Sequence, residues 1–201
     1  MKYPIELPNV TLVALTNKDF EGHKYAIDKS CEGINFGAVK LIWDEKCTSI
    51  DEWNRKIIYD LHHYIDTDFA LLIHADGYVV RPDLWRKEFL DYDYIGAPWP
   101  LPTDDYSYRT SSGEIVRVGN SVSIRSIKLM RRTASRVWKP YYGNTNEDGF
   151  ICVHHKEFLE EKGCKFAPLD VAKHFSKECE IPENEGLETF AFHTYVKPYI
   201  K

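Results

Sequence analysis

Apolar and polar residues alternate in blocks along the first half of the chain. Residues 10–15 and 38–43 are rich in apolar and β-branched side chains, which is typical of strands. Residues 69–73 are apolar at every position, as in a central strand of a parallel sheet that helices cover on both faces. A helix is predicted over about residues 23–31, between the first two strands.

A second helix is predicted to begin at Ser49. Ser49 and Glu52 have the spacing of a capping box, in which both side chains satisfy free backbone amides at the helix start. The apolar residues that follow recur at helical spacing and predict one buried stripe, formed by Trp53, Ile57, Ile58, Leu61, Tyr64 and Ile65.

The order strand, helix, strand, helix, strand favours a doubly wound α/β architecture with right-handed crossovers. Ligands of such sheets bind beyond the carboxyl ends of the strands. We therefore expect two polar strand ends, Thr16-Asn17 and His74-Ala75-Asp76, to share one crevice.

The second half is less regular. Pro82 can open a short helix, residues 94–97 resemble a short strand, and residues 98–113 form a long loop rich in Pro, Tyr, Asp and Ser. A strand over residues 116–124, interrupted at Gly119-Asn120, precedes a helix that starts near Ser126 and has apolar residues as far as Val137. Another helix is predicted over residues 146–161. Since no repeat or linker divides the chain, we expect one domain over residues 1–201.

Composition excludes several classes of protein. The 201 residues carry 26 Lys and Arg against 31 Asp and Glu, and a net charge of −5 gives no general attraction to nucleic acid or anionic lipid. The longest apolar run is too short to span a membrane, and the first 20 residues lack the pattern of a signal peptide. Five cysteines at irregular spacing suggest reduced thiols. We expect a cytoplasmic protein.

His74-Ala75-Asp76 is the best candidate for chemistry. A carboxylate at the end of a central strand lies where a divalent ion and a diphosphate could meet, and an oxygen and imidazole set suits Mn²⁺, or Mg²⁺. The alternative is that Asp76 only caps the turn made by Gly77.

Three further candidates each have a structural alternative. Glu147 and Asp148 open a predicted helix, so they either compensate its dipole or supply a general base. His193 follows two phenylalanines and is either a packed side chain or a ligand. Trp99, next to the long loop, is either an aromatic platform for a sugar ring or part of the core.

Several common motifs are missing from the sequence. It has no GxGxxG after the first strand, no GxxxxGK[ST], no GxSxG and no HExxH. These absences argue against dinucleotide oxidoreductases, P-loop enzymes, esterases and zincins, and leave metal-assisted chemistry on a diphosphate.

Seven short blocks, in this order, resemble a GT-A-like glycosyltransferase family of bacteria and large viruses, some of whose members build capsid glycans. They are residues 69–78, 93–99, 118–120, 147–152, 166–168, 172–176 and 190–193, within a resemblance that covers roughly residues 9–194. The resemblance implies a Rossmann-like α/β fold with a mixed, mostly parallel central sheet and helices on both faces. Residues 1–97 would then hold the nucleotide sugar, and residues 98–201 the acceptor and catalytic groups.

The same resemblance implies a metal-dependent hexosyl- or deoxyhexosyltransferase. Its donor would be a UDP-sugar and its acceptor a glycan or glycoprotein. His74-Ala75-Asp76 stands in place of the family's DxD-type signature, with His at the first acid, so Asp76 is kept as the metal ligand and the ribose contact is in doubt. His193 matches a second metal ligand and Asp148 the acid near the anomeric carbon. The remaining matches are donor contacts at Thr16, Asn17, Asp44 and His74, and acceptor contacts at Trp99, Asn120 and Glu147.

Two other functions remain open. A sugar-phosphate nucleotidyltransferase shares the layered sheet, but it normally needs a Gly-rich basic loop where this chain supplies only Lys18. A carbohydrate-binding module that has lost its chemistry is consistent with the His74 departure. We expect no nucleic-acid partner, and for a viral protein the host cytoplasm as location. Further domains after Lys201 are compatible with the resemblance.

Overall fold

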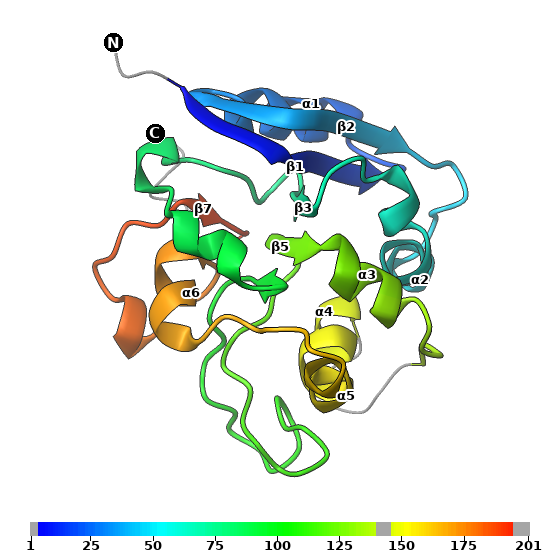
Figure 1. Cartoon of the computed structure of the whole chain (residues 1–201), viewed down its shortest axis with the longest axis vertical. Coiled ribbons are helices and arrows are strands. Elements are labelled where there is room, and N and C mark those ends of the chain that lie inside the picture. Colours follow the sequence, from blue (N-terminus) through cyan, green and yellow to red (C-terminus); the bar gives the residue numbers. More distant parts are fainter. Residues whose placement is uncertain (1–3, 140–145, 195–201) are drawn as a thin grey trace.

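A five-stranded sheet forms the centre of the computed structural model, which describes residues 4–139 and 146–194 (Figure 1). The strand order is β2-β1-β3-β5-β4. β1 runs parallel to β2 and β3, whereas β5 is antiparallel to its neighbours β3 and β4. The predicted mixed, mostly parallel sheet is confirmed. The strands are β1 (Ile5–Thr16), β2 (Ile34–Trp43), β3 (Phe69–Leu72), β4 (Tyr94–Ile95) and β5 (Ser123–Ser126).

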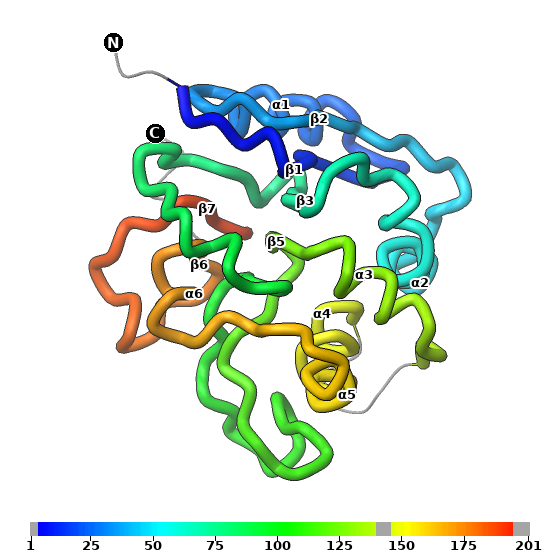
Figure 2. The backbone as a smooth tube through the Cα atoms, in the orientation of Figure 1, coloured from blue at the N-terminus to red at the C-terminus, as the bar shows by residue number. Residues whose placement is uncertain are grey.

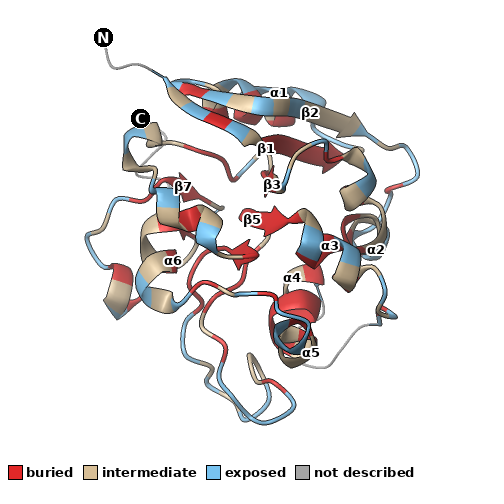
Figure 3. Ribbon diagram, in the orientation of Figure 1, coloured by how far each residue is buried: buried red, intermediate tan, exposed pale blue. Residues whose placement is uncertain are grey.

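Helices cover both faces of this sheet, as the alternation along β1 requires. Leu12 and Ala14 pack in one apolar cluster with Ala26 of α1 (Phe20–Ser30), and α6 (Leu169–Phe175) contributes to the same cluster. The side chains between them point the other way, where Val13 packs with Ile57 of α2 (Ile50–Tyr59) and with Met130 of α3 (Ile127–Thr133). The strands β3, β4 and β5 and the second half of β1 are accordingly buried, whereas the edge strand β2 and the outer helix surfaces are partly exposed (Figure 3).

The capping box at Ser49 is present as predicted. Ser49 Oγ accepts from the Glu52 amide at 3.2 Å, and Glu52 Oε2 accepts from the Ser49 amide at 3.1 Å. This local signal sets where α2 starts, and the buried stripe after it continues into a 3₁₀ turn at Leu61–Tyr64.

The segment between β4 and β5 is a long excursion without strands of its own (Figure 2, the green loop). The strand predicted over residues 116–124 begins only at Ser123, because Val118 makes just an isolated bridge to Pro98. The helix after Ser126 also ends early, at Thr133, and Val137 is 81% exposed rather than buried. The predicted helix at Pro82 is two 3₁₀ turns, Pro82–Leu84 and Lys87–Asp91.

The single helix predicted over residues 146–161 is interrupted. It consists of α4 (Glu147–Gly149), a π-helical turn (Phe150–His154) and α5 (Lys156–Glu161). In the π turn the His155 amide donates to the Phe150 carbonyl at 3.1 Å, one residue further back than in an α-helix. The turn buries Phe150, Ile151, Cys152 and Val153 together, which a continuous α-helix would spread over more than one face.

A second, two-stranded sheet lies beside the first. Its strands β6 (Ser176–Lys177) and β7 (Ala191–Phe192) are parallel, and a 3₁₀ turn at Pro182–Asn184 lies between them in the chain. All five cysteines are free thiols, in agreement with the sequence. Across the described ranges, no helix is both long and apolar enough to cross a membrane. The sequence analysis allowed for further domains after Lys201, and this residue lies outside the described ranges.

Candidate active site

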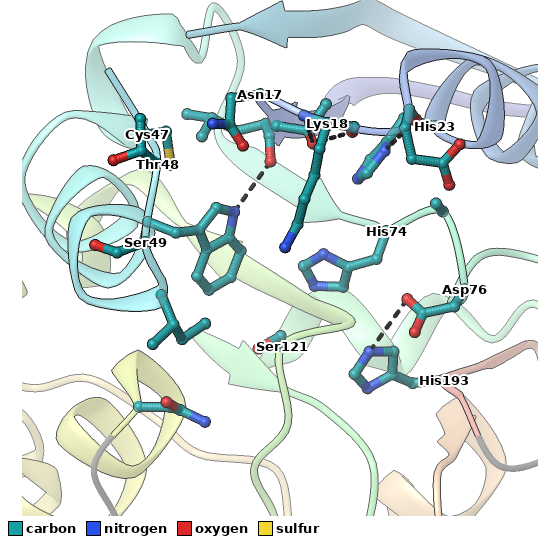
Figure 4. A pocket seen from close by; sticks show the side chains of 17 residues that line it. Asn17, Lys18, His23, Cys47, Thr48, Ser49, His74, Asp76, Ser121 and His193 are labelled. Atoms are coloured by element: carbon teal, nitrogen blue, oxygen red, sulfur yellow. Dashed lines mark hydrogen bonds and ion pairs between the residues drawn. The ribbon is translucent and has the colours of Figure 1, made fainter. Parts of the chain in front are cut away.

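A cavity of about 540 Å³ opens at the carboxyl ends of β1 and β3 (Figure 4). The two polar strand ends predicted to share a crevice do so here, since Thr16, Asn17, His74 and Asp76 all line it. The start of α2 forms another wall, and His193, which follows β7, closes the side next to Asp76. The remaining lining residues are Leu15, Lys18, Asp19, His23, Cys47, Thr48, Ser49, Ile50, Trp53, Ala75, Ser121 and Asn146.

A tight turn after β3 presents Asp76 to this cavity. The His74 amide donates to the Gly77 carbonyl at 2.8 Å, and the Gly77 amide donates back at 3.2 Å. A Cβ at Gly77 would lie 2.7 Å from His193 Cδ2 and 2.6 Å from a Val122 methyl. Glycine is therefore needed for His193 to approach the turn this closely.

The side chains of Asp76 and His193 lie close to each other, as expected from the sequence for two residues that bind the same metal ion. Asp76 Oδ1 lies 3.7 Å from His193 Nε2, and the Asp76 side chain is 61% exposed. The Asp76 carboxylate accepts from Thr194 Oγ1 at 3.2 Å rather than capping the turn. The carboxylate and the ring nitrogen thus face each other at the cavity wall with a gap too long for a hydrogen bond.

The other ring nitrogen of His193 has two polar neighbours. Nδ1 is 3.4 Å from Glu178 Oε1 and 3.3 Å from Asn120 Nδ2. Burial disfavours the charged imidazole, but the contact with Glu178 and the charges of Glu178 and Asp76 outweigh it, so the pKa of His193 is raised.

The imidazole of His74, next to His193 in the cavity wall, is neutral. Burial, and after it the positive charge of His193, lowers the pKa of His74 well below its ordinary value. Its ring lies between those of Trp53 and His193, at centroid distances of 5.4 and 5.2 Å. Its Nε2 is buried without a hydrogen-bond partner among the described residues, which leaves this atom available to a ligand.

Two lining side chains were not singled out from the sequence. Trp53 is held by a hydrogen bond from its indole Nε1 to the Leu15 carbonyl at 3.0 Å. Lys18 extends toward His74 (Figure 4), and within the part of the chain described here its ammonium group has no carboxylate partner. Its backbone is held by Thr16, whose Oγ1 accepts from the Lys18 amide at 3.1 Å. The sequence does offer a signal for Lys18, which is the one cation of residues 16–22. It offers none for Trp53, whose spacing is that of the buried apolar stripe of α2.

Asp148 is not among the residues that line the cavity, but it lies near enough to His193 for its charge to help raise the pKa of that imidazole. Burial, and then the charge of Glu147, raise the pKa of Asp148 to about 7, although its Oδ1 accepts from the Gly149 amide at 2.7 Å. A carboxyl that titrates near neutrality can exchange a proton at physiological pH, which suits a general base.

Glu147, by contrast, is buried and structural. It is fully buried, and its Oε1 lies 2.6 Å from Arg125 Nη2 and accepts from Ser121 Oγ at 3.0 Å. The predicted acceptor contact at Glu147 is wrong, because no part of its carboxylate reaches the surface. The adjacent Asn54 Oδ1 accepts from the Glu147 amide at 3.1 Å and so fixes the start of α4.

Three more sequence predictions need correction. Trp99 is 5% exposed and packs on Gly119 and Tyr108, so it belongs to the core and has no open face for a sugar. Asn120 is 1% exposed and contacts His193 instead of an acceptor. Asp44 does not line the cavity, because its carboxylate pairs with Lys56 Nζ at 2.9 Å.

Asp76 and His193 fit a divalent cation that a bound substrate would help to hold. Over residues 4–139 and 146–194, no group of three or more His, Cys, Asp and Glu side chains could hold a metal ion by itself. Asp76 and His193 offer one carboxylate and one imidazole at an open cavity. Mg²⁺ and similar ions are commonly bound by one or two carboxylates plus substrate phosphates, so an open pair is the arrangement expected for a metal that arrives with a diphosphate.

Comparison with known proteins gives a family and a fold. The family described as "Protein of unknown function (DUF5672)" matches residues 44–193. No curated protein sequence matches the chain. A crystal structure of a glycosyltransferase involved in the glycosylation of the major capsid of PBCV-1 is similar over 95% of both chains, with a TM-score of 0.61 and 11% identity. The predicted GT-A-like fold class is thereby supported. A197 from STIV covers 79% of this chain and 80% of its own at 9% identity, but a TM-score of 0.35 carries no argument.

Proposed function

This chain belongs to the DUF5672 family, and we propose that it is a glycosyltransferase that moves a sugar from a nucleotide-diphosphate donor to a glycan or glycoprotein. The observation that carries the proposal is the pairing of Asp76 and His193 across 3.7 Å at the wall of the cavity. A glycosyltransferase must stabilise a departing diphosphate, and this pair provides the ligands for a cation that can do so. The fold shared with a PBCV-1 glycosyltransferase supports the same activity.

The donor, for which we favour a UDP-sugar, would lie along the ends of β1 and β3. Thr16 and Asn17 line the cavity there, and Lys18 brings a positive charge toward the same space. The Trp53 ring, fixed through its indole nitrogen, provides a flat apolar wall for a planar base. The unpaired Nε2 of His74 would find its hydrogen-bond partner in the donor.

Asp76 and His193 would hold Mn²⁺, or Mg²⁺, which would stabilise the negative charge on the leaving diphosphate without a proton transfer. Lys18 adds a second positive group on the opposite side of the cavity from Asp76, where it can neutralise a diphosphate oxygen. Neutral His74 between them avoids a third positive charge that would oppose cation binding.

Asp148 would act on the acceptor. With its pKa near 7, it can take the proton of an acceptor hydroxyl as that oxygen attacks the anomeric carbon, which inverts the configuration there. In a retaining enzyme the same carboxylate would instead stabilise positive charge on the sugar ring. The Arg125–Glu147 pair keeps Asp148 in place by anchoring the start of α4 to β5.

The transferred sugar would be a hexose or deoxyhexose. The PBCV-1 enzyme is involved in the glycosylation of the major capsid of that virus, and we propose a glycan or glycoprotein acceptor for this chain. We also propose that it acts in the cytoplasm, or in the host cytoplasm for a viral protein.

The test is incubation of the purified chain with a panel of UDP-sugars and Mn²⁺, followed by release of UDP. Slow release that depends on the metal supports a glycosyltransferase. Formation of UTP that depends on pyrophosphate would instead identify a nucleotidyltransferase. Binding of UDP-sugars without turnover, with or without acceptor glycans, would identify an inert carbohydrate-binding module and overturn the proposal.

A further inference from the structure

Glu178 is a half-buried acid whose place is set by the pairing of β6 with β7. The two strands are parallel with Lys177 opposite Phe192, and the His193 amide donates to the Lys177 carbonyl at 3.0 Å. The register therefore brings the next residue, Glu178, alongside His193. The Glu178 side chain is 23% exposed, and its Oε1 lies 3.4 Å from His193 Nδ1.

This carboxylate is not used to balance a cation within the described ranges. The neighbouring Lys177 ammonium pairs with Glu180 at 3.2 Å, not with Glu178. Over residues 4–139 and 146–194, the polar contact of the Glu178 carboxylate is with the His193 imidazole. Glu178 can accept a proton from Nδ1, whereas Asp76, 3.7 Å from Nε2, is beyond hydrogen-bond distance, so of the two acids Glu178 is the one that bears on the tautomer.

The two neighbours of Nδ1 favour opposite tautomers of His193. Asn120 Oδ1 accepts from the Val122 amide at 2.9 Å, so the Asn120 NH₂ group is the part that faces Nδ1, at 3.3 Å. That contact would require Nδ1 to accept and would place the proton on Nε2. Glu178 requires the reverse, with the proton on Nδ1. The contact with the charged group is the stronger of the two, so the Nδ1–H form is favoured.

We propose that Glu178 is a positioning residue that keeps the His193 proton on Nδ1 and so leaves the Nε2 lone pair free, beside Asp76, to bind a divalent cation. This inference rests on the metal site of the proposed function and adds a residue to it. A carboxylate that accepts from the far nitrogen of a metal-binding histidine orients the ring and strengthens the ligand.

The tautomer can be measured without any metal. Nitrogen-15 chemical shifts of the His193 ring, at a pH where the imidazole is neutral, report which nitrogen carries the proton. We expect Nδ1–H in the unmodified protein and a shift toward Nε2–H in Glu178→Ala, because Asn120 then governs Nδ1. Glu178→Gln should lie between the two, since its amide oxygen can still accept. An unchanged tautomer in Glu178→Ala overturns the proposal.

The metal arm uses Mn²⁺ alone, with the free ion followed by electron paramagnetic resonance. Glu178→Ala should weaken Mn²⁺ binding by about 10- to 100-fold, the usual effect of losing such a partner. The matched control is Glu180→Ala, which removes the same charge from a side chain that is 67% exposed and does not touch His193. Equal losses in the two variants would mean that only net charge matters, and would overturn the assignment.

The two arms separate this inference from the proposed function. A tautomer that depends on Glu178 in a protein that binds no Mn²⁺ would support the positioning of His193 and refute the metal site. Tight Mn²⁺ binding that ignores Glu178 would support the metal site and refute the positioning. Near-ultraviolet circular dichroism of each variant confirms that the fold is retained.

Discussion

Arg125 and Glu147 form an ion pair inside the protein, with 2.6 Å between Arg125 Nη2 and Glu147 Oε1 and with side chains that are 1% and 0% exposed. The pair joins β5 to the start of α4, and Arg125 is held further by Ser123 Oγ at 2.8 Å and by the Tyr94 ring. The residue after Glu147 is the proposed base, Asp148. The buried pair therefore links the sheet to the carboxyl that we propose as the base.

Breaking this pair should destabilise the fold. Arg125→Met leaves Glu147 buried without its cation, which should cost about 3–5 kcal/mol in the free energy of unfolding by urea. The double variant Arg125→Met, Glu147→Leu should lose less than the single one, because no charge remains buried. As a control, Lys24→Ala breaks an exposed pair with Asp28 and should cost less than about 1 kcal/mol. A double variant worse than Arg125→Met would contradict this account.

Asp148 should trade stability for function. Its pKa is raised from about 3.8 to about 7 in the folded protein, so the folded state holds a proton that the unfolded state has lost across this range. Stability should therefore fall as pH rises from about 4 to about 7 and stay low above it. Asp148→Asn removes this effect and should raise the free energy of unfolding by about 4 kcal/mol at about pH 8, with little gain at about pH 4.

The control for that experiment is Asp170→Asn, at an exposed carboxyl whose pKa is lowered by its hydrogen bond to Lys173. It should bring no gain at high pH. Thermal denaturation of the three proteins over a pH series provides the measurement, and a stabilisation by Asp148→Asn that is independent of pH would rule out titration as the cause.

The same carboxyl should govern the rate of transfer. A general base must be deprotonated, so kcat should rise as pH increases through about 7 and level off above it. Asp148→Asn should keep donor affinity but lose transfer by about 100-fold or more, within the usual contribution of a general base. Initial rates with saturating acceptor test both points, and a normal rate in Asp148→Asn would remove this residue from the mechanism.

Asp76 should be essential for metal-dependent turnover. Asp76→Ala removes the carboxylate that faces His193, and we expect both donor hydrolysis and transfer to fall by about 100-fold or more, as befits lost charge stabilisation at the leaving group. Asp28→Ala changes an exposed acid on α1 and should have no such effect. Coupled assays for released UDP measure the loss. Undiminished hydrolysis in Asp76→Ala is the result that the proposal cannot accommodate.

Lys18 should contribute to donor binding through its charge. Lys18→Met keeps the length of the side chain and should weaken UDP binding by about 10-fold, the effect of one charged hydrogen bond. The comparison is Lys24→Met, whose lysine pairs with Asp28 on the exposed side of α1. Isothermal titration at two salt concentrations checks the result, since the contribution of Lys18 should shrink as salt increases.

Much of the first half was predictable because its signals are local. Apolar runs predicted the strands, and residues 69–73, apolar at every position, predicted a sheet with helices on both faces. Ser49 and Glu52 set the start of α2 through contacts within one turn. The polar ends of β1 and β3 were expected to meet, since parallel neighbouring strands end at the same edge of a sheet. Asp76 and His193 were matched by resemblance to a family, and the fold brings them together.

The second half was predicted less well, because distant residues decide it. The helical pattern of residues 146–161 gives no indication of the π turn, which buries four consecutive side chains at once. A glutamate is ordinary at the start of a helix, so the sequence gives no sign that Glu147 is buried. Its partner in the buried ion pair, Arg125, comes from β5. The sequence allowed Trp99 to be either exposed or buried. It is buried because Gly119, which has no side chain, leaves room for its ring.

The sequence by itself determined the order of strands and helices, the two layers around the sheet and the edge at which polar side chains collect, since these follow from side-chain periodicity and from contacts between near neighbours. Only the tertiary structure decided which acids are buried in ion pairs and which face the cavity. The exposure and the partners of Glu147, Glu178 and Asp44 depend on residues from other elements, as does the raised pKa of Asp148. An amino-acid sequence does not record burial, or the distance between segments that fold together.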